Sequence, residues 1–231
     1  MEEFTWINEK PLYSFGGRLL SNYGVGQSAL NFEKINSPAG TGFTVSGRQI
    51  GLRTLSLPIH IFGETPENTQ ENVSRLLREF LAGKVKLNLP DGFLYFAVLT
   101  GQEGPTFITE EMVSLTLTLE GIRCRAMKSE TGHAFSIQGT LPEMDCIIRV
   151  TVGKQAETYT VAGITFDGGD RFAGVEVGDL IVIDGISKRV TINGEAAMDR
   201  CDLVEFPRVH PGENLIEAPD PVTLEYYPTY L

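Results

Sequence analysis

Two segments of the chain alternate strictly between apolar and polar side chains, which is the pattern of a β-strand with one buried face. In residues 55–61 every second residue is Leu or Ile, and in residues 113–119 Val and Leu alternate with Ser and Thr. Pro58 lies inside the first segment and lacks a backbone N–H, so we place it near a sheet edge or a bulge. Ile50 and Leu52 fall in the opposite phase from Leu55, which predicts a bulge near Arg53–Thr54. An antiparallel sheet is expected here.

One amphipathic helix is well marked, at residues 66–82. Thr65 can cap its first turn, Pro66 suits the first helical position, and Gly83 ends it. Its apolar residues recur at helical spacing, at Val73, Leu76, Leu77, Phe80 and Leu81. A helix with one apolar stripe is expected to cover a sheet of its own domain.

The other strand-like segments are short and separated by Gly, Pro, Asn and Asp. They are residues 85–89 and 94–99, and then 134–141, 146–152, 158–166, 180–183, 188–192 and 222–226. The later group shows no helical periodicity. Short strands with frequent turns predict a β-sandwich or jelly roll for the second half of the chain.

A polar stretch at residues 128–132 marks the expected domain boundary, giving domains 1–128 and 133–231. The charge balance changes at the same place. Residues 1–128 carry 12 Lys and Arg against 13 Asp and Glu, a net charge of −1, whereas residues 129–231 carry 7 against 17, a net charge of −10. An acidic surface without clustered cations argues against nucleic-acid binding, and the acidity is expected mainly to keep the protein soluble.

Composition excludes several classes of protein. With 231 residues, 42% of them hydrophobic, the chain can form real cores. It has no apolar run long enough to span a membrane and does not start with a secretory signal pattern, so synthesis in the cytoplasm is expected. Its cysteines, Cys124, Cys146 and Cys201, are far apart and lack metal-site spacing, so we expect free thiols. Asn72 begins a glycosylation-type triplet inside the predicted helix, which we attribute to chance.

No residue pattern predicts catalysis, a cofactor or a metal site. The three histidines, His60, His133 and His210, have no nucleophile or carboxylate at a known catalytic spacing. Asp167 and Asp170 stand on a glycine loop that resembles part of a calcium site, but further ligands are missing and an acidic turn is favoured. The glycine pairs at residues 24–26 and 40–42 do not fit a phosphate-binding loop and are expected in turns.

Sugar binding is the alternative that the expected jelly roll leaves open, because sugars stack on aromatic rings. The only Trp, Trp6, lies in the other half of the chain. The possible aromatic platforms are Tyr159, Phe166, Phe172, Tyr226 and Tyr227. Each is more simply explained as a core or sheet residue, and the fold alone does not establish lectin activity.

The last part of the chain, residues 189–231, reads as strand, turn, loop, second turn and closing strand. Asn193–Gly194 suits a tight hairpin, and Pro207, Pro211 and Gly212 surround the second reversal. In this order the motifs Asn193-Gly194-Glu195, Phe206-Pro207 and Pro211-Gly212-Glu213-Asn214, followed by residues 223–231, resemble the C-terminal region of the distal tail protein (Dit) family of long-tailed, non-contractile phages.

The first half adds to this resemblance, which covers most of the chain. It has an N-terminal strand with Phe4 and Trp6, the pair Gly47–Arg48 ahead of the strand at 53–62, and then the helix and two short strands. Gly47–Arg48 continues as Gln49-Ile50-Gly51 where the family has an immediate glycine, and the chain leaves no room for an inserted carbohydrate-binding module.

The resemblance implies a ring-forming N-terminal β-sandwich or barrel-like domain with one helix, followed by a galectin-like or jelly-roll C-terminal β-sandwich. It also implies a structural, non-enzymatic virion protein. A homo-hexameric ring at the tail tip or baseplate would join the tail tube protein to tail-associated, tail fibre or receptor-binding proteins, without specific nucleic-acid binding or membrane insertion. The source could be an active phage, a prophage or a tail-derived bacteriocin. The rival function is a lectin-like module for attachment to the host surface, and a hydrolase is a distant third.

Overall fold

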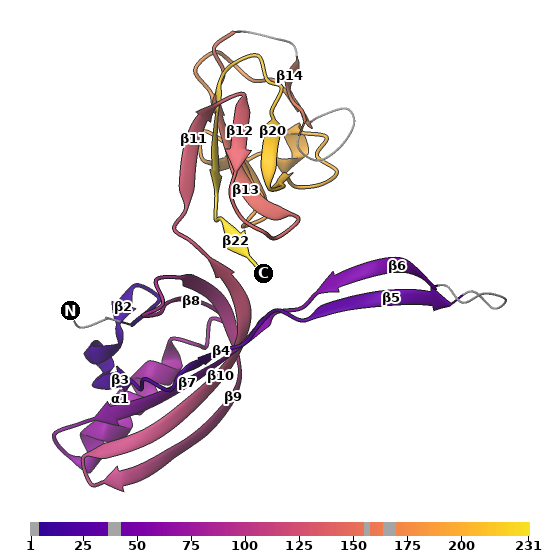
Figure 1. The fold of residues 1–231 in the computed structure, drawn as a ribbon. Coiled ribbons are helices and arrows are strands. Elements are labelled where there is room, and N and C mark those ends of the chain that lie inside the picture. The colour runs from indigo at the N-terminus through magenta and orange to yellow at the C-terminus, as the bar shows by residue number, and fades with distance from the viewer. Residues whose placement is uncertain (1–4, 37–42, 155–157, 164–169) are drawn as a thin grey trace. The chain divides into compact units, whose positions relative to one another are not determined.

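The computed structural model describes residues 5–36, 43–154, 158–163 and 170–231, and Figure 1 shows its elements. They form two compact units: unit 1 runs to Cys124 and includes Leu231, and unit 2 is Arg125–Tyr230. Antiparallel strands dominate both units, so the expected mainly β class is confirmed. The stretch in which the sequence places the domain boundary forms strand β11 (Lys128–Gly132) of unit 2.

Unit 1 is built on one antiparallel sheet. Its strands are β1 (Trp6–Ile7), β2 (Lys10–Pro11), β3 (Gly17–Leu19), β4 (Gly24–Val25), β7 (Arg53–Phe62), β8 (Lys84–Asn88), β9 (Leu94–Thr109) and β10 (Met112–Cys124). They lie in the order β2-β1-β8-β9-β10-β7-β3, and β4 also pairs with β7. A short 3-10 helix, η1 (Leu12–Phe15), follows β2.

The alternation seen in the sequence places one face of β7 and β10 in the core. Their fully buried residues are Leu55, Leu57, Ile59, Ile61, Val113, Leu115, Leu117 and Leu119. β7 pairs with β10 without interruption from Arg53 to Phe62, so the predicted bulge is wrong. The phase changes because one strand ends at Ile50 and the next begins at Arg53. Pro58 lies between the stretches of β7 that pair with β3 and β4, so its missing N–H removes no hydrogen bond to either strand.

The helix α1 (Pro66–Arg78) covers the buried face of this sheet. The Thr65 side chain accepts a hydrogen bond from the Asn68 amide at 3.2 Å, as the capping pattern predicts. The helix is shorter than predicted because tighter turns follow it, with the amides of Phe80 and Leu81 donating to carbonyls three residues back. Phe80 still reaches the core, whereas Leu81 is exposed.

A two-stranded ribbon, β5 (Leu30–Asn36) and β6 (Phe43–Ile50), forms the second part of unit 1 and is called the arm below. The two strands pair only with each other among the described residues. Figure 1 shows the arm extending away from the sheet. The predicted glycine turn at residues 40–42 lies outside the described residues.

Unit 2 is a β-sandwich with its own core. One sheet contains β11, β13 (Met144–Thr151), β16 (Leu180–Asp184), β17 (Arg189–Ile192), β18 (Glu195–Ala196) and β21 (Val222–Tyr226), in the order β11-β21-β13-β16-β17-β18, with β19 (Arg208–Val209) also on β13. The other layer contains the pairs β12 (Ala134–Ile137) with β20 (Gly212–Leu215) and β14 (Thr158–Val161) with β15 (Asp170–Ala173). The remaining elements are η2 (Met198–Arg200) and β22 (Thr229–Tyr230). No described helix has the length and apolar character of a membrane span.

Candidate interaction surface

The histidines have local structural partners. The His60 ring lies on β7 with its centroid 6.4 Å from that of Phe62, in an edge-on arrangement. The Nδ1 atom of His133 is 3.4 Å from the carbonyl oxygen of Ile216. His210 contacts Asn214 in the same turn, with 2.6 Å between Nδ1 and Oδ1. All three contacts are to neighbours within the fold, and none brings a nucleophile or carboxylate to a histidine.

Asn214 explains the second turn motif of the C-terminal region. Its side chain is buried, and its Oδ1 accepts from the His210 amide at 3.1 Å while its Nδ2 donates to the carbonyls of His210 (2.7 Å) and Gly212 (3.2 Å). Gly212 has a φ of 97°, which favours glycine. The motif therefore stabilises a chain reversal through hydrogen bonds among its own residues.

The first turn motif is also structural. Asn193 and Gly194 both have positive φ, as a tight hairpin between β17 and β18 requires. The Asn193 side chain accepts from the Leu180 amide at 2.9 Å and donates to Asp179 at 2.7 Å. This ties the hairpin to the start of β16.

Of the two acidic residues on the glycine loop, expected to form an acidic turn, the structure describes Asp170, and Asp167 lies outside the described residues. The Asp170 side chain is 4% exposed, and its Oδ1 has no hydrogen-bond partner among the described residues. Burial, with the nearby Asp202 carboxylate, raises the pKa of Asp170 to about 7. Within the described part of the chain no three His, Cys, Asp or Glu side chains are placed to hold a metal ion.

The cysteines are free, as expected. Burial raises the pKa of Cys124 and of Cys146 to about 12, so both thiols stay protonated at neutral pH. Cys201 is half-buried, and burial also raises its pKa.

The aromatic residues considered for sugar stacking belong mostly to the core. Tyr159, Phe172 and Tyr226 are fully buried between the layers of unit 2, so their rings cannot stack on a sugar. Tyr227 is half-buried, and Phe166 lies outside the described residues. Burial therefore excludes three of the five aromatic residues considered as sugar-stacking platforms.

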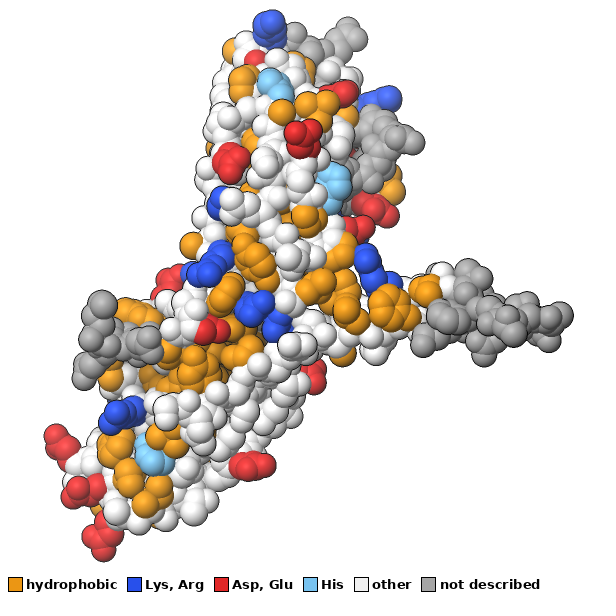
Figure 2. All heavy atoms as spheres, in the orientation of Figure 1, with side chains coloured by type: hydrophobic (Ala, Val, Ile, Leu, Met, Phe, Trp, Pro, Cys, Tyr) orange, Lys and Arg blue, Asp and Glu red, His pale blue; other side chains and the backbone are white. Residues whose placement is uncertain are grey.

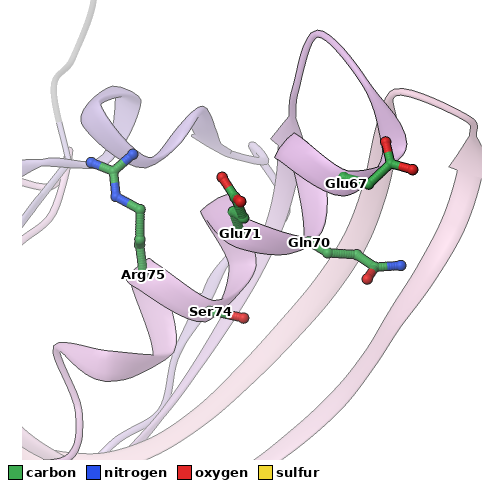
Figure 3. Close-up of a pocket in the computed structure, with 5 residues that line it drawn as sticks. All are labelled: Glu67, Gln70, Glu71, Ser74 and Arg75. Carbon is green, nitrogen blue, oxygen red and sulfur yellow. The ribbon is translucent and has the colours of Figure 1, made fainter.

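A shallow hollow lies along the solvent side of α1, and Figure 3 shows that all five lining residues come from this helix. They are Glu67, Gln70, Glu71, Ser74 and Arg75. The Arg75 guanidinium is used locally: it donates to Asn72 Oδ1 and to the Ser14 carbonyl, both at 3.3 Å, and lies 5.9 Å from the centre of the Phe15 ring. Side chains from one helix face do not converge on a ligand, so we assign no binding site to this hollow.

The arm is the most unusual surface of unit 1. In the β5–β6 register Leu30 pairs with Ile50 and Phe32 pairs with Arg48, which puts these side chains on one face together with Val45. Leu30, Phe32 and Val45 remain 50%, 49% and 49% exposed, and Figure 2 shows hydrophobic side chains along the described part of the arm. The opposite face carries Asn31, Glu33 and Gln49. The arm is therefore an amphipathic ribbon whose apolar face is uncovered.

A second exposed surface lies where β9 turns into β10. β8 pairs only with Leu94–Val98 of β9, so the outer edge of residues 99–109 has no strand partner among the described residues. Phe107 and Ile108 lie on this edge, 46% and 49% exposed, and Glu103, Glu110 and Glu111 are exposed beside them. We call these five residues the acidic tip. Residues 101–122 contain no Lys or Arg.

Comparison with known proteins identifies unit 2. Residues 138–230 match the family model described as siphovirus-type tail component, C-terminal domain. This range covers both turn motifs. No curated protein matches the chain.

Solved structures extend the likeness to the whole chain. The crystal structure of the Dit protein of phage SPP1, described as a paradigm of hub adsorption apparatus in phages that infect Gram-positive bacteria, matches with a TM-score of 0.71 at 12% identity over 99% of each chain. The phage P2 baseplate, in its activated conformation with Ca, matches with a TM-score of 0.61 at 13% identity over 92% of this chain and 90% of that one. The same baseplate with Sr gives a TM-score of 0.60.

At these identities the structures show the fold, and the family model shows the relationship for the C-terminal unit. The range that matches the family model contains both turn motifs on which the resemblance rests, residues 193–195 and 211–214. The resemblance to the phage distal tail proteins is therefore confirmed: residues 138–230 match the siphovirus-type tail component model, and the whole chain has the fold of the SPP1 Dit protein.

Proposed function

We propose that this protein is a structural hub of a phage tail tip or baseplate that assembles as a homo-hexameric ring. The observation that carries the proposal is the arm. A two-stranded hairpin without further packing is only marginally stable in water, so an amphipathic one favours a partner that covers its apolar face. In a ring, the arm of each subunit reaches the next, and cyclic closure satisfies every such head-to-tail contact.

The energy available from this contact is moderate. Full burial of a Leu, Val or Phe side chain contributes about 1.5–3 kcal/mol. Leu30, Phe32 and Val45 are already half-covered, so completing their burial contributes about 1 kcal/mol each. About 3 kcal/mol per arm, repeated around a closed ring, supports assembly at micromolar concentration together with other contacts.

In this arrangement residues 1–128 form the ring and residues 133–231 form an outer domain. The ring would join the tail tube protein to tail-associated and receptor-binding proteins, in keeping with the hub and baseplate roles named for the similar structures. The net charge of −11 disfavours adhesion of passing DNA. The role is structural and non-enzymatic, and its site is the virion tail.

Light scattering coupled to size exclusion tests the ring. The wild-type chain of 25.4 kDa should give a hexamer mass that persists over a range of micromolar concentrations. Replacing Leu30 and Phe32 by Ser should shift the mass towards monomer, whereas replacing Asn31 and Gln49, on the polar face of the arm, by Ser should not. A wild-type protein that is monomeric at every concentration contradicts the proposal.

The genetic neighbourhood gives an independent test of the partners. A tape-measure gene upstream and a tail-associated protein gene downstream are expected. Co-expression with the neighbouring tail-associated protein should yield a complex that co-elutes, and co-elution with neither neighbour would oppose the hub role.

A further inference from the structure

We propose that the apolar face of the arm docks on the acidic tip of a second copy of this chain. This inference rests on the proposed ring and names the surface that receives the arm. It joins two features of unit 1 that the fold leaves uncovered. Both consist of half-exposed apolar side chains flanked by charge, and the two charges are opposite.

Among the side chains that the structure describes, Arg48 is the cation that the arm brings to the contact. Arg48 pairs with Phe32 across the ribbon, so its guanidinium belongs to the apolar face. It is exposed, and no described carboxylate forms a salt bridge with it. A docking surface for this face therefore needs apolar side chains and at least one carboxylate.

The acidic tip meets both requirements. Phe107 and Ile108 supply apolar area, and Glu103, Glu110 and Glu111 supply carboxylates without an adjacent cation in the same hairpin. The end of β7 and the residues after it add Phe62 and Glu64, both exposed, and Figure 2 shows acidic side chains around this end of unit 1. The nearest cation by strand register is Arg18, which lies opposite His60 on β3.

The backbone of β9 adds a third element. Thr106–Thr109 follow Pro105, which itself lacks an N–H, and the outer N–H and C=O groups of this stretch face no described strand. Such an edge readily accepts another strand. The arm has strand edges of its own, so side-chain docking and edge pairing can occur together.

Other exposed apolar residues fit the arm less well. Leu81 lies beyond α1, close in sequence to Arg78, Lys84 and Lys86, so a cationic arm would meet like charge there. Tyr13 lies on η1 as a single exposed ring. The acidic tip alone, among the described residues of unit 1, combines exposed apolar side chains with excess carboxylates.

Charge reversal in the full-length chain tests the pairing. Arg48→Glu alone, and Glu110→Lys with Glu111→Lys, should each weaken oligomerisation by about ten-fold, because each places like charges across the contact. Combining all three in one chain should restore the oligomer to within about three-fold of wild type. Glu130→Lys, at an exposed position on β11 of unit 2, is the matched control and should leave assembly unchanged.

The outcomes separate this inference from the ring itself. If the wild-type chain never assembles, the ring and the docking of the arm on the acidic tip are both refuted. If wild type assembles and the Leu30 and Phe32 variants do not, but Glu110→Lys with Glu111→Lys behaves as wild type, the ring stands and the acidic tip is refuted. Failure of the combined variant to recover also refutes the pairing, provided its circular dichroism matches wild type; Glu110→Gln with Glu111→Gln, which removes charge without reversing it, should show a smaller loss.

Discussion

Replacing Asp170 by Asn should stabilise unit 2, and the gain should grow with pH. The residue is 4% exposed, and burial raises the pKa of its carboxyl from the ordinary 3.8 to about 7 in the folded chain. Because the folded pKa is raised, the folded state retains its proton between about pH 4 and 7 while the unfolded state has lost it. Wild-type stability therefore falls as pH rises through this window and then levels off.

The size of the effect follows from the shift. Each pKa unit corresponds to about 1.4 kcal/mol, so a shift of about three units costs wild type at most about 4 kcal/mol at pH 8. At pH 4 the cost is only about 0.5 kcal/mol, because the folded state is protonated and the carboxyl of the unfolded state is only about 60% ionised. Asn is close to the same shape and carries no charge, which removes the pH-dependent part.

Urea unfolding of the full chain, followed by circular dichroism at pH 4, 6 and 8, measures the difference between variant and wild type. The Asp170→Asn gain should rise across the series, and Asp202→Asn should give a smaller gain, because the like charge is the lesser cause of the raised pKa. A gain that is the same at pH 4 and 8, or a variant less stable than wild type at pH 8, would refute the reasoning.

Three further results are expected. Gly63→Ala should destabilise unit 1 by more than about 2 kcal/mol, because an added Cβ would clash with the backbone amide of Thr69, whereas Gly24→Ala meets only ordinary contact and should be near neutral in the same urea experiment. Asn214→Ala should destabilise unit 2 by about 2–3 kcal/mol in thermal melts, since it removes the three hydrogen bonds by which this buried side chain holds the turn; unchanged melting would contradict this. Cys146 should not react with a thiol reagent at pH 8 until the chain unfolds, and rapid labelling of the native protein would disprove its burial.

Strands and the helix were predictable wherever one face is buried. The alternation at residues 55–61 and 113–119, and the helical stripe that begins at Val73, arise because these side chains share one core. The end of the helix was misplaced because Phe80 reaches that core from a tighter turn. Periodicity predicts which side chains face the core, but it does not predict the backbone geometry that places them there.

Elements outside a core gave weaker signals. The arm was not predicted, because none of the apolar side chains of the arm whose exposure the structure describes is buried. β9 extends to Thr109, beyond the predicted residue 99, since its outer half is exposed on both faces and shows no alternation. Lys128–Gly132 resembled a linker because a polar edge strand has the composition of one.

The apolar face of the arm and the acidic tip could not be predicted from the sequence for the same reason. No pattern in residues 30–36 indicates that Phe32 is exposed, and the acidic tip is uncovered because β8 pairs only with Leu94–Val98 of β9. The buried state of Asp170 was equally unpredictable, since its neighbours along the chain suggest an acidic turn.

The arm contributes no side chain to either hydrophobic core among the described residues. Substitutions on its apolar face should therefore leave the folding of both units largely unchanged. If the arm docks on a second copy as proposed, selection can act on assembly at these positions independently of selection on stability. The arms of related tail proteins could then diverge until subunits from two phages in one host cell fold equally well but do not assemble with each other.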